Sequence, residues 1–318
     1  MSEKIKLNEL DKVEILSLMD NYIDFMVRDN SNTVKRVGMV KDGIVNNSIF
    51  AEHGFSAIIK TEANAQSRSM LFDFGFSAEG AAYNAKKLGI DMTVIEEMAL
   101  SHGHSDHTGS IAALTLLIGK KGIRLVAHPQ AFVSSRYLKV GKDFKIKIPL
   151  LSKEKLQKEG IKVEEAAEPV SLLGGNVLFL SEIPRLTDFE KGMPNAYYAE
   201  NGVEKIDTLP DDTSLVMNLK GRGLIILSGC AHAGIINTVY HARKVTGIDS
   251  VHAVMGGFHL SGPHFEPLIE KVIAAFKEIN PHYIIPTHCT GRKAINAIEK
   301  EFPGKFLLNM SGTTLTFN

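Results

Sequence analysis

Short runs of β-branched and apolar residues alternate along most of this chain with longer segments whose apolar residues recur at helical spacing. This alternation is typical of strands connected by helices that pack on the faces of a sheet, so it predicts a layered α/β fold. Strands are expected at 13–19, 55–60, 69–74, 98–100, 123–127, 177–180, 214–219, 224–227, 251–255 and 283–286, with a terminal edge strand at 313–317. Helices are expected at 78–88, 111–118, 235–243, 267–279 and 292–301.

The composition excludes several classes of protein. The 36 basic and 36 acidic side chains cancel, so we expect no general attraction to nucleic acid or to an anionic membrane. The longest apolar run, 111–118, is far shorter than the roughly 20 residues of a membrane-spanning helix. Two cysteines, Cys230 and Cys289, exclude a disulfide framework and suit a reducing compartment. With no apolar signal sequence at the N-terminus, we expect a cytoplasmic protein.

Two neighbouring segments lack the regular alternation. Residues 139–165 are rich in lysine, and residues 184–212 show little periodicity and contain several prolines and glycines. Structureless loops longer than about 12–15 residues are uncommon in compact domains unless they act as lids or binding loops. We therefore expect a single domain over 1–318, with an insertion or lid within 139–212.

The strongest chemical signal is the run Ser101–Gly109, SHGHSDHTG, which directly follows an apolar strand. Residues i and i+2 of an extended backbone project to the same side, so His102 and His104 can converge on one ion. Asp106 and His107 then lie where the chain turns into a helix, near a second point. Imidazole and carboxylate ligands suit Zn²⁺, with Mn²⁺ or Fe²⁺ as alternatives, and the glycines permit close backbone approach.

Three further strand-end turns carry a histidine: GCAHAG with His232, GGFHL with His259 and THCTG with His288. Ligands in α/β proteins gather beyond the carboxyl ends of strands. Four such turns in one chain therefore indicate a single site built from distant segments.

The pattern His102-x-His104-x-Asp106-His107 matches the HxHxDH signature of the metallo-β-lactamase superfamily, and the order of strand-end motifs extends this resemblance over almost the whole chain. The turns around His232, His259 and His288 resemble one subfamily, that of 7,8-dihydropterin-6-methyl-4-(β-D-ribofuranosyl)aminobenzene 5′-phosphate synthase.

The resemblance implies a four-layer αββα sandwich with one or two metal ions at one edge. It implies that His102 and His104 bind the first ion, that Asp106, His107 and His288 bind the second, and that Asp73 supports the motif loop.

The chain departs from the superfamily pattern at the bridging aspartate, whose position is taken by Cys230. His232 is the candidate for the third histidine of the first ion, with Asp211 or Asp212 as alternatives. The Cys230 thiolate is an alternative to the missing carboxylate.

The leading hypothesis is metal-assisted hydrolysis, in which a metal-activated hydroxide attacks a phosphoester or related anionic ester. Asp106 would orient the nucleophile, and His259 would act as a general acid or bind the substrate. Cys289 and His53 are assigned to the surroundings of the site, and Arg185 is the candidate for binding a phosphate of a small-molecule substrate.

Two alternatives stay open at this point. One is a transferase that joins a pterin to a ribosyl-aminobenzene phosphate, and the other is a non-catalytic metal-dependent sensor or binding protein. No feature of the sequence indicates an oligomeric state.

Overall fold

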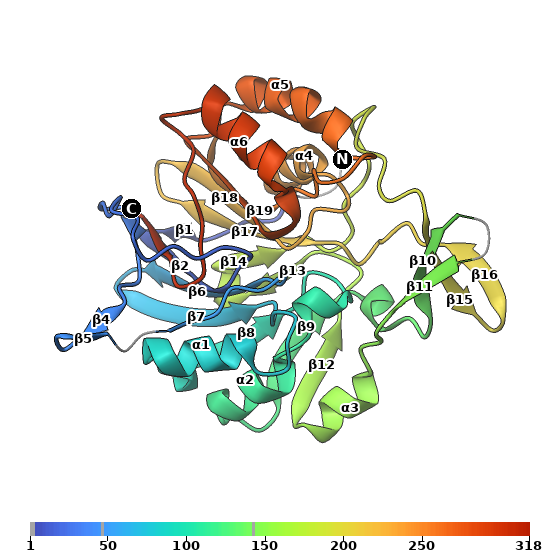
Figure 1. The fold of residues 1–318 in the computed structure, drawn as a ribbon, viewed down its shortest axis with the longest axis horizontal. Helices are drawn as coiled ribbons and strands as arrows, with labels where there is room; N and C mark the ends of the chain where they lie inside the picture. The colour runs from blue at the N-terminus through green and yellow to red at the C-terminus, as the bar shows by residue number, and fades with distance from the viewer. Residues whose placement is uncertain (1–3, 46–47, 142–143) are drawn as a thin grey trace.

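The computed structural model describes residues 4–45, 48–141 and 144–318, and two large sheets form its centre (Figure 1). One sheet has eight strands in the order β12-β9-β8-β7-β6-β2-β21-β3. Their bounds are Ile161–Glu165 (β12), Ile123–Ala127 (β9), Ile95–Ala99 (β8), Gln66–Phe72 (β7), Ser56–Ala63 (β6), Lys12–Met19 (β2), Thr314–Phe317 (β21) and Val34–Lys35 (β3).

The second sheet has seven strands in the order β13-β14-β17-β18-β19-β20, with β1 paired to β17. Their bounds are Val170–Leu172 (β13), Val177–Phe179 (β14), Ser214–Leu219 (β17), Gly223–Ser228 (β18), Val251–Gly257 (β19), Tyr283–Thr287 (β20) and Glu9–Leu10 (β1).

Helices cover the outer face of each sheet, which gives four layers (Figure 1). The helices α4, α5 and α6 lie on the seven-stranded sheet, and α1, α2 and α3 lie on the eight-stranded sheet. Their bounds are Gly80–Leu88 (α1), Ile111–Ile118 (α2), Lys153–Lys158 (α3), Ile235–Thr246 (α4), Ile269–Ile279 (α5) and Arg292–Glu301 (α6).

The apolar core is divided among the layers. Side chains from both sheets, including Phe72, Phe179 and Phe317, form the central cluster between the sheets. Separate clusters lie under α1 and α2 and under α4, α5 and α6. Each sheet is therefore buried on both faces, as expected for near-continuous apolar strands. The predicted αββα sandwich is confirmed.

One prediction about an individual segment is wrong. The strand at 313–317 is not an edge strand, because β21 pairs with β2 on one side and with β3 on the other. Within 139–212, residues 161–165 form β12, which pairs in parallel with β9 at the end of the eight-stranded sheet.

The rest of 139–212 contains more regular structure than the sequence suggested. A small antiparallel sheet of order β11-β10-β15-β16 projects from one side of the molecule (Figure 1). Its strands are Phe144–Ile148 (β11), Arg136–Val140 (β10), Ala196–Glu200 (β15) and Val203–Ile206 (β16). Residues 142–143 of the expected insertion lie outside the described residues.

A short hairpin, β4 (Val40–Lys41) with β5 (Ile44–Val45), projects at the opposite side (Figure 1). Among the helices described here, none is long and apolar enough to cross a membrane.

Candidate metal centre

The carboxyl ends of six strands carry the loops that form the candidate site. In the eight-stranded sheet β2, β7 and β8 run in the same direction, and in the seven-stranded sheet β18, β19 and β20 do. Parallel strands place their carboxyl ends at one edge, where ligands gather. The two sheets are linked at this edge, since Thr213, just before β17, donates its N–H to Ser101 O after β8 at 3.1 Å.

The first ligand set consists of His102, His104 and His232. Their ligand nitrogens lie within 4.8 Å of one another. His232 Nε2 lies 3.2 Å from His102 Nε2 and 3.2 Å from His104 Nδ1. All three side chains are buried.

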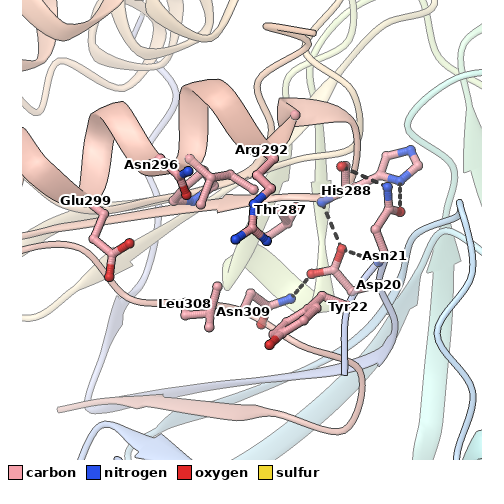
Figure 2. Close-up of a pocket in the computed structure, with 13 residues that line it drawn as sticks. Asp20, Asn21, Tyr22, Thr287, His288, Arg292, Asn296, Glu299, Leu308 and Asn309 are labelled. Atoms are coloured by element: carbon pink, nitrogen blue, oxygen red, sulfur yellow. Dashed lines mark hydrogen bonds between the residues drawn. The ribbon is translucent and has the colours of Figure 1, made fainter. Parts of the chain in front are cut away.

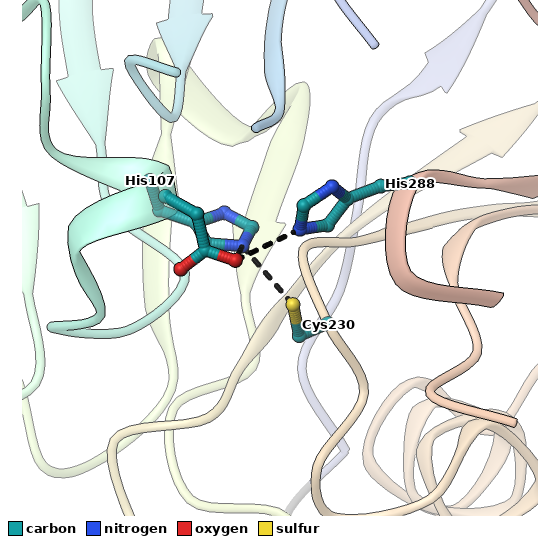
Figure 3. Close-up of side chains that lie close together, drawn as sticks. His107, Cys230 and His288 are labelled. Atoms are coloured by element: carbon teal, nitrogen blue, oxygen red, sulfur yellow. Dashed lines mark hydrogen bonds and ion pairs between the residues drawn. The ribbon is translucent and has the colours of Figure 1, made fainter. Parts of the chain in front are cut away.

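The second ligand set consists of Asp106, His107, Cys230 and His288, whose ligand atoms lie within 4.8 Å of one another. Figure 3 shows His107, Cys230 and His288 pointing toward one another from three loops. His107 Nε2 lies 3.1 Å from Cys230 Sγ, and His288 Nε2 lies 3.1 Å from Asp106 Oδ2. The two sets adjoin, because the His102 and His107 ring centroids are 4.4 Å apart.

The donors of the first set fit a divalent cation. Burial holds the pKa of His102 and His232 well below the ordinary value and lowers the pKa of His104 to about 4. The three imidazoles are therefore neutral near pH 7. His232 Nε2 can carry only one proton, so it can donate to His102 Nε2 or to His104 Nδ1 but not to both. Lone pairs of the three rings therefore converge without a hydrogen atom for each contact. Neutral imidazoles are the form that binds Zn²⁺ and related ions.

The second set also favours a positive charge. Burial alone would lower the pKa of His107, but the carboxylates of Asp73 and Asp106 raise it to about 9. The nearby His107 and His288 imidazoles keep the pKa of Asp106 far below normal, although burial opposes them. The negative charge that stabilises a proton on His107 would also stabilise a divalent cation that displaces this proton. A cysteine sulfur, two imidazoles and a carboxylate are donors that suit Zn²⁺ or Fe²⁺.

Asp73 lies behind the motif loop and holds three of its groups. Its carboxylate accepts hydrogen bonds from Ser101 N at 2.7 Å and Ser101 Oγ at 2.7 Å, and lies 2.6 Å from His107 Nδ1. With His107 Nδ1 occupied in this way, Nε2 is directed toward Cys230. Ser101 Oγ also lies 2.9 Å from His102 Nδ1. The structure therefore places Asp73 where the sequence predicted support for the loop.

Two residues that the sequence reasoning missed hold His288 (Figure 2). Asp20 accepts the His288 backbone N–H at 2.8 Å, and Asn21 Oδ1 lies 2.9 Å from His288 Nδ1. Both residues follow β2 and line a cavity of about 330 Å³ beside His288. The sequence signal that could have identified them is a pair of polar residues directly after a strand whose carboxyl end lies at the site.

His259, Cys289 and His53 lie around the two sets. His259 has its ring centroid 4.3 Å from that of His232, and with Cys230 and Cys289 it forms a third group of nearby ligand atoms. Cys289 Sγ lies 3.3 Å from Cys230 Sγ. His53 is at the rim, where its Nε2 lies 3.9 Å from Asp106 Oδ2.

The two alternative aspartates have other partners. Asp211 accepts Gly103 N–H at 2.9 Å and forms an ion pair with the buried Arg136. Asp212 accepts Ala233 N–H at 2.8 Å, and burial raises its pKa to about 6. Neither aspartate belongs to a ligand group among the described residues, whereas His232 lies in one with His102 and His104.

Arg185 does not join either set. Its guanidinium donates hydrogen bonds to the carbonyl oxygens of Ile183 and Thr208. The structure thus uses Arg185 to tie two loop segments together, which the sequence alone did not indicate.

Comparison with known proteins gives the relationship of the chain. No family model matches it. The 7,8-dihydropterin-6-methyl-4-(β-D-ribofuranosyl)-aminobenzene-5′-phosphate synthase of Methanocaldococcus jannaschii is 31% identical over 318 residues, covering 98% of this chain and 99% of that protein. An uncharacterized protein of the same organism is 30% identical over 275 residues, covering 83% of this chain and 94% of that protein.

The structural comparison agrees in fold. A crystal structure of a metal-dependent hydrolase of the β-lactamase superfamily matches with a TM-score of 0.69 at 24% identity, covering 96% of this chain and 98% of that chain. The layers, the convergent ligand sets and the full-length similarity lead to one conclusion: the chain belongs to the metallo-β-lactamase superfamily, in the family of the archaeal dihydropterin ribofuranosyl-aminobenzene phosphate synthase.

Proposed function

We propose that the protein is a metal-dependent hydrolase that acts on a phosphoester or related anionic ester of a small molecule. The observation that carries this proposal is the pair of adjoining ligand sets, with His102 and His107 rings 4.4 Å apart. A divalent cation held there, Zn²⁺ or alternatively Mn²⁺ or Fe²⁺, lowers the pKa of coordinated water toward about 7 and neutralises a substrate anion.

The side chains of the site have distinct roles in this proposal. Asp106 is the most exposed member of the second set, at 18% of its side chain, so it can accept a hydrogen bond from the attacking water and orient it. In this proposal His259, which lies against His232, donates a proton to the leaving group. His102, His104 and His107 are buried. They exclude bulk water from the first ligand set and from the region where the two ligand sets meet.

A second candidate function is the transferase reaction. It is favoured by the identity with the archaeal synthase along 98% of this chain. The same sites would then polarise a pterin substrate that carries a leaving group. The amino group of an aminobenzene ribosyl phosphate would replace water as the nucleophile, displacing the leaving group and releasing one proton.

One assay separates the two functions. Protein loaded with Zn²⁺ or Mn²⁺ is incubated with bis(4-nitrophenyl) phosphate and a panel of esters and thioesters, and separately with pterin and ribosyl-aminobenzene phosphate substrates. Hydrolysis that falls about 10²–10⁴-fold in Asp106→Asn supports the hydrolase. Coupling without hydrolysis supports the transferase. A metal-loaded protein inactive in every assay supports a sensor or binding protein.

The metal assignment has its own control. His232→Ala should lower the metal content per chain, as measured by elemental analysis, whereas His282→Ala, an exposed histidine away from the site, should not. Full metal content in His232→Ala would show that the first set is wrongly assigned.

A further inference from the structure

The two cysteines of the chain, Cys230 and Cys289, meet at the second ligand set. Cys230 follows β18 and Cys289 follows β20, and β19 lies between these two strands in the sheet. The two sulfur atoms are 3.3 Å apart, and Cys289 Sγ also lies 3.7 Å from the carbonyl oxygen of Cys230. The fold therefore directs two side chains from separate loops at one another.

A glycine at the end of β19 makes this contact possible. A Cβ on Gly257 would lie 2.6 Å from Cys289 Sγ and 3.3 Å from Cys230 Cα. The Gly257 N–H donates to Gly229 O at 2.9 Å, which holds β19 close to the loop that carries Cys230. Because atoms 2.6 Å apart would overlap, a larger residue in place of Gly257 would displace the Cys289 sulfur atom. The backbone of β19 thus leaves the space in which the two sulfur atoms meet.

Cys230 has a second partner, which belongs to the metal centre. Its Sγ lies 3.1 Å from His107 Nε2, and Figure 3 shows it pointing toward His107 and His288. A metal ion needs this sulfur atom free, because the thiolate is the form of cysteine that binds metals. A sulfur atom that is bonded to a second sulfur atom is neither a thiol nor a thiolate. Cys230 can therefore bind a metal ion or form a disulfide, but not both.

The sulfur atoms need little movement to form a bond. They must approach by roughly 1.2 Å to reach the roughly 2.05 Å of a disulfide. Cys289 is the more exposed of the two residues, at 7% against 2% for Cys230, so an oxidant is expected to reach Cys289 first. His259, which forms a group of nearby ligand atoms with both sulfur atoms, also lines a cavity of about 200 Å³. A small oxidant in that cavity would lie against a side chain that adjoins the sulfur pair.

We propose that a peroxide converts Cys230 and Cys289 into a reversible disulfide and thereby removes one ligand from the second set. The Cys289 sulfur attacks one oxygen of hydrogen peroxide, the O–O bond breaks, and a sulfenic acid and one water molecule form. The Cys230 sulfur then displaces the hydroxyl group of the sulfenic acid as a second water molecule, and the S–S bond forms. Two electrons pass from the sulfur pair to the peroxide, and the two thiol hydrogens leave in the water molecules. A dithiol reductant restores both thiols by exchange.

The disulfide acts on the second ligand set alone. Oxidation leaves that set with Asp106, His107 and His288 as its three donors, whereas the first set contains no sulfur and keeps all of its ligands. We therefore expect the second ion to leave and the first ion to stay. This inference rests on the metal centre of the proposed function, and neither the reaction nor the substrate plays a part in it.

The test follows the disulfide and the metal separately. Reduced protein loaded with Zn²⁺ is treated with one equivalent of hydrogen peroxide. Thiol titration of the denatured protein should fall from two thiols per chain to none, and peptide mapping without reductant should join the two cysteine peptides. Elemental analysis should then find about one ion fewer per chain, because metal affinity depends on the ligands that are available. Dithiothreitol followed by fresh Zn²⁺ should restore the lost ion.

The matched variant is Cys289→Ser, which keeps the Cys230 thiol but removes its partner. It should bind as much Zn²⁺ as the original protein and should retain this Zn²⁺ at the same dose of peroxide. If it instead loses an ion after peroxide as the original protein does, the loss does not depend on a disulfide. If it lacks an ion before any oxidation, Cys289 is itself a metal ligand. Either result would overturn the proposal.

Two results with the original protein would also overturn it. One is the absence of a linked peptide after peroxide treatment, and the other is a disulfide form that keeps its full metal content. A failure of the proposed function would appear in the assays with esters and phosphodiesters, which none of these measurements uses. The two failures can therefore be distinguished.

Discussion

At the scale of single residues, three of the imidazoles in the centre have their second nitrogen held by a neighbouring side chain. His102 contacts Ser101, His107 contacts Asp73, and His288 contacts Asn21. Such contacts fix the ring orientation and the tautomer, so that the other nitrogen presents its lone pair to a cation. One carboxylate, Asp73, serves two of these rings, directly for His107 and through Ser101 for His102.

Asp73→Asn should therefore weaken metal binding by about 10- to 100-fold. The amide keeps the shape but loses the charge that directs the His107 proton to Nδ1. The measurement is competition with a chromophoric chelator. Asp249→Asn alters an exposed aspartate and provides the comparison. Equal affinity in both variants would remove Asp73 from any supporting role.

Protonation predicts how the stability of the metal-free chain depends on pH. His104 has a folded pKa of about 4, so between pH 6.5 and 4 the unfolded chain binds the extra proton and stability falls as pH falls. His107 has a folded pKa of about 9, so its contribution is complete below pH 6.5 and is lost as pH rises toward 9. Urea unfolding from pH 4 to 9 should therefore show maximum stability near pH 6.5. Stability that rises steadily to pH 9 would contradict the Asp73–His107 contribution.

At the scale of elements, the ligand loops depend on positions where no side chain fits. Gly103 separates His102 from His104, and a Cβ on it would lie 2.3 Å from Ala131 O. Its N–H is also held by Asp211. The loop after β8 is thus pressed against the turn after β9, which fixes the directions of both histidines.

Gly103→Ala should destabilise the protein by about 1–3 kcal/mol and weaken metal binding, because the loop must move away from Ala131. Urea unfolding and metal titration measure the two effects. Gly304→Ala places its Cβ where no atom lies within 4 Å and should change neither. A Gly103→Ala protein with unchanged metal affinity would show that the loop adapts without moving the ligands.

The bounds of several helices and strands could be predicted from the sequence. The helices 111–118 and 292–301 and the strand 214–219 match α2, α6 and β17 at both ends, because apolar periodicity and flanking glycines mark them. The strand β12 was missed because its IKVEE sequence lies at a sheet edge and carries charges. Asp20 and Asn21 were missed because one polar pair has no motif, and only the parallel direction of β2 and β7 brings it to the site.

At the scale of the whole molecule, one buried arginine connects the small sheet to the metal centre. Arg136 begins β10, and its guanidinium pairs with Asp207 at 2.6 Å and with Asp211 at 2.8 Å. Asp211 in turn holds the Gly103 N–H between two ligand histidines. The projecting sheet and the ligand loop therefore share one charge network.

Arg136→Ala should cost about 3–5 kcal/mol, because it leaves two buried carboxylates without their cation. The pKa of Asp211, which Arg136 lowers against the effect of burial, should rise. The loss of stability should consequently be larger at pH 7 than at pH 4, where protonation relieves the unpaired charges. Urea unfolding at both pH values measures this, with the exposed Arg222→Ala as the comparison. A pH-independent loss would mean that packing, rather than charge, explains the effect.

The position of β21 has a consequence for synthesis in the cell. Val13 of β2 pairs with Phe317 of β21, so the two neighbouring strands are far apart in the sequence and β2 is made long before β21. While the ribosome is still elongating, β2 has an unpaired flank, and such open flanks promote aggregation. The eight-stranded sheet therefore closes only after β21 has been synthesised, and until then β2 has β6 as its neighbour on one side alone.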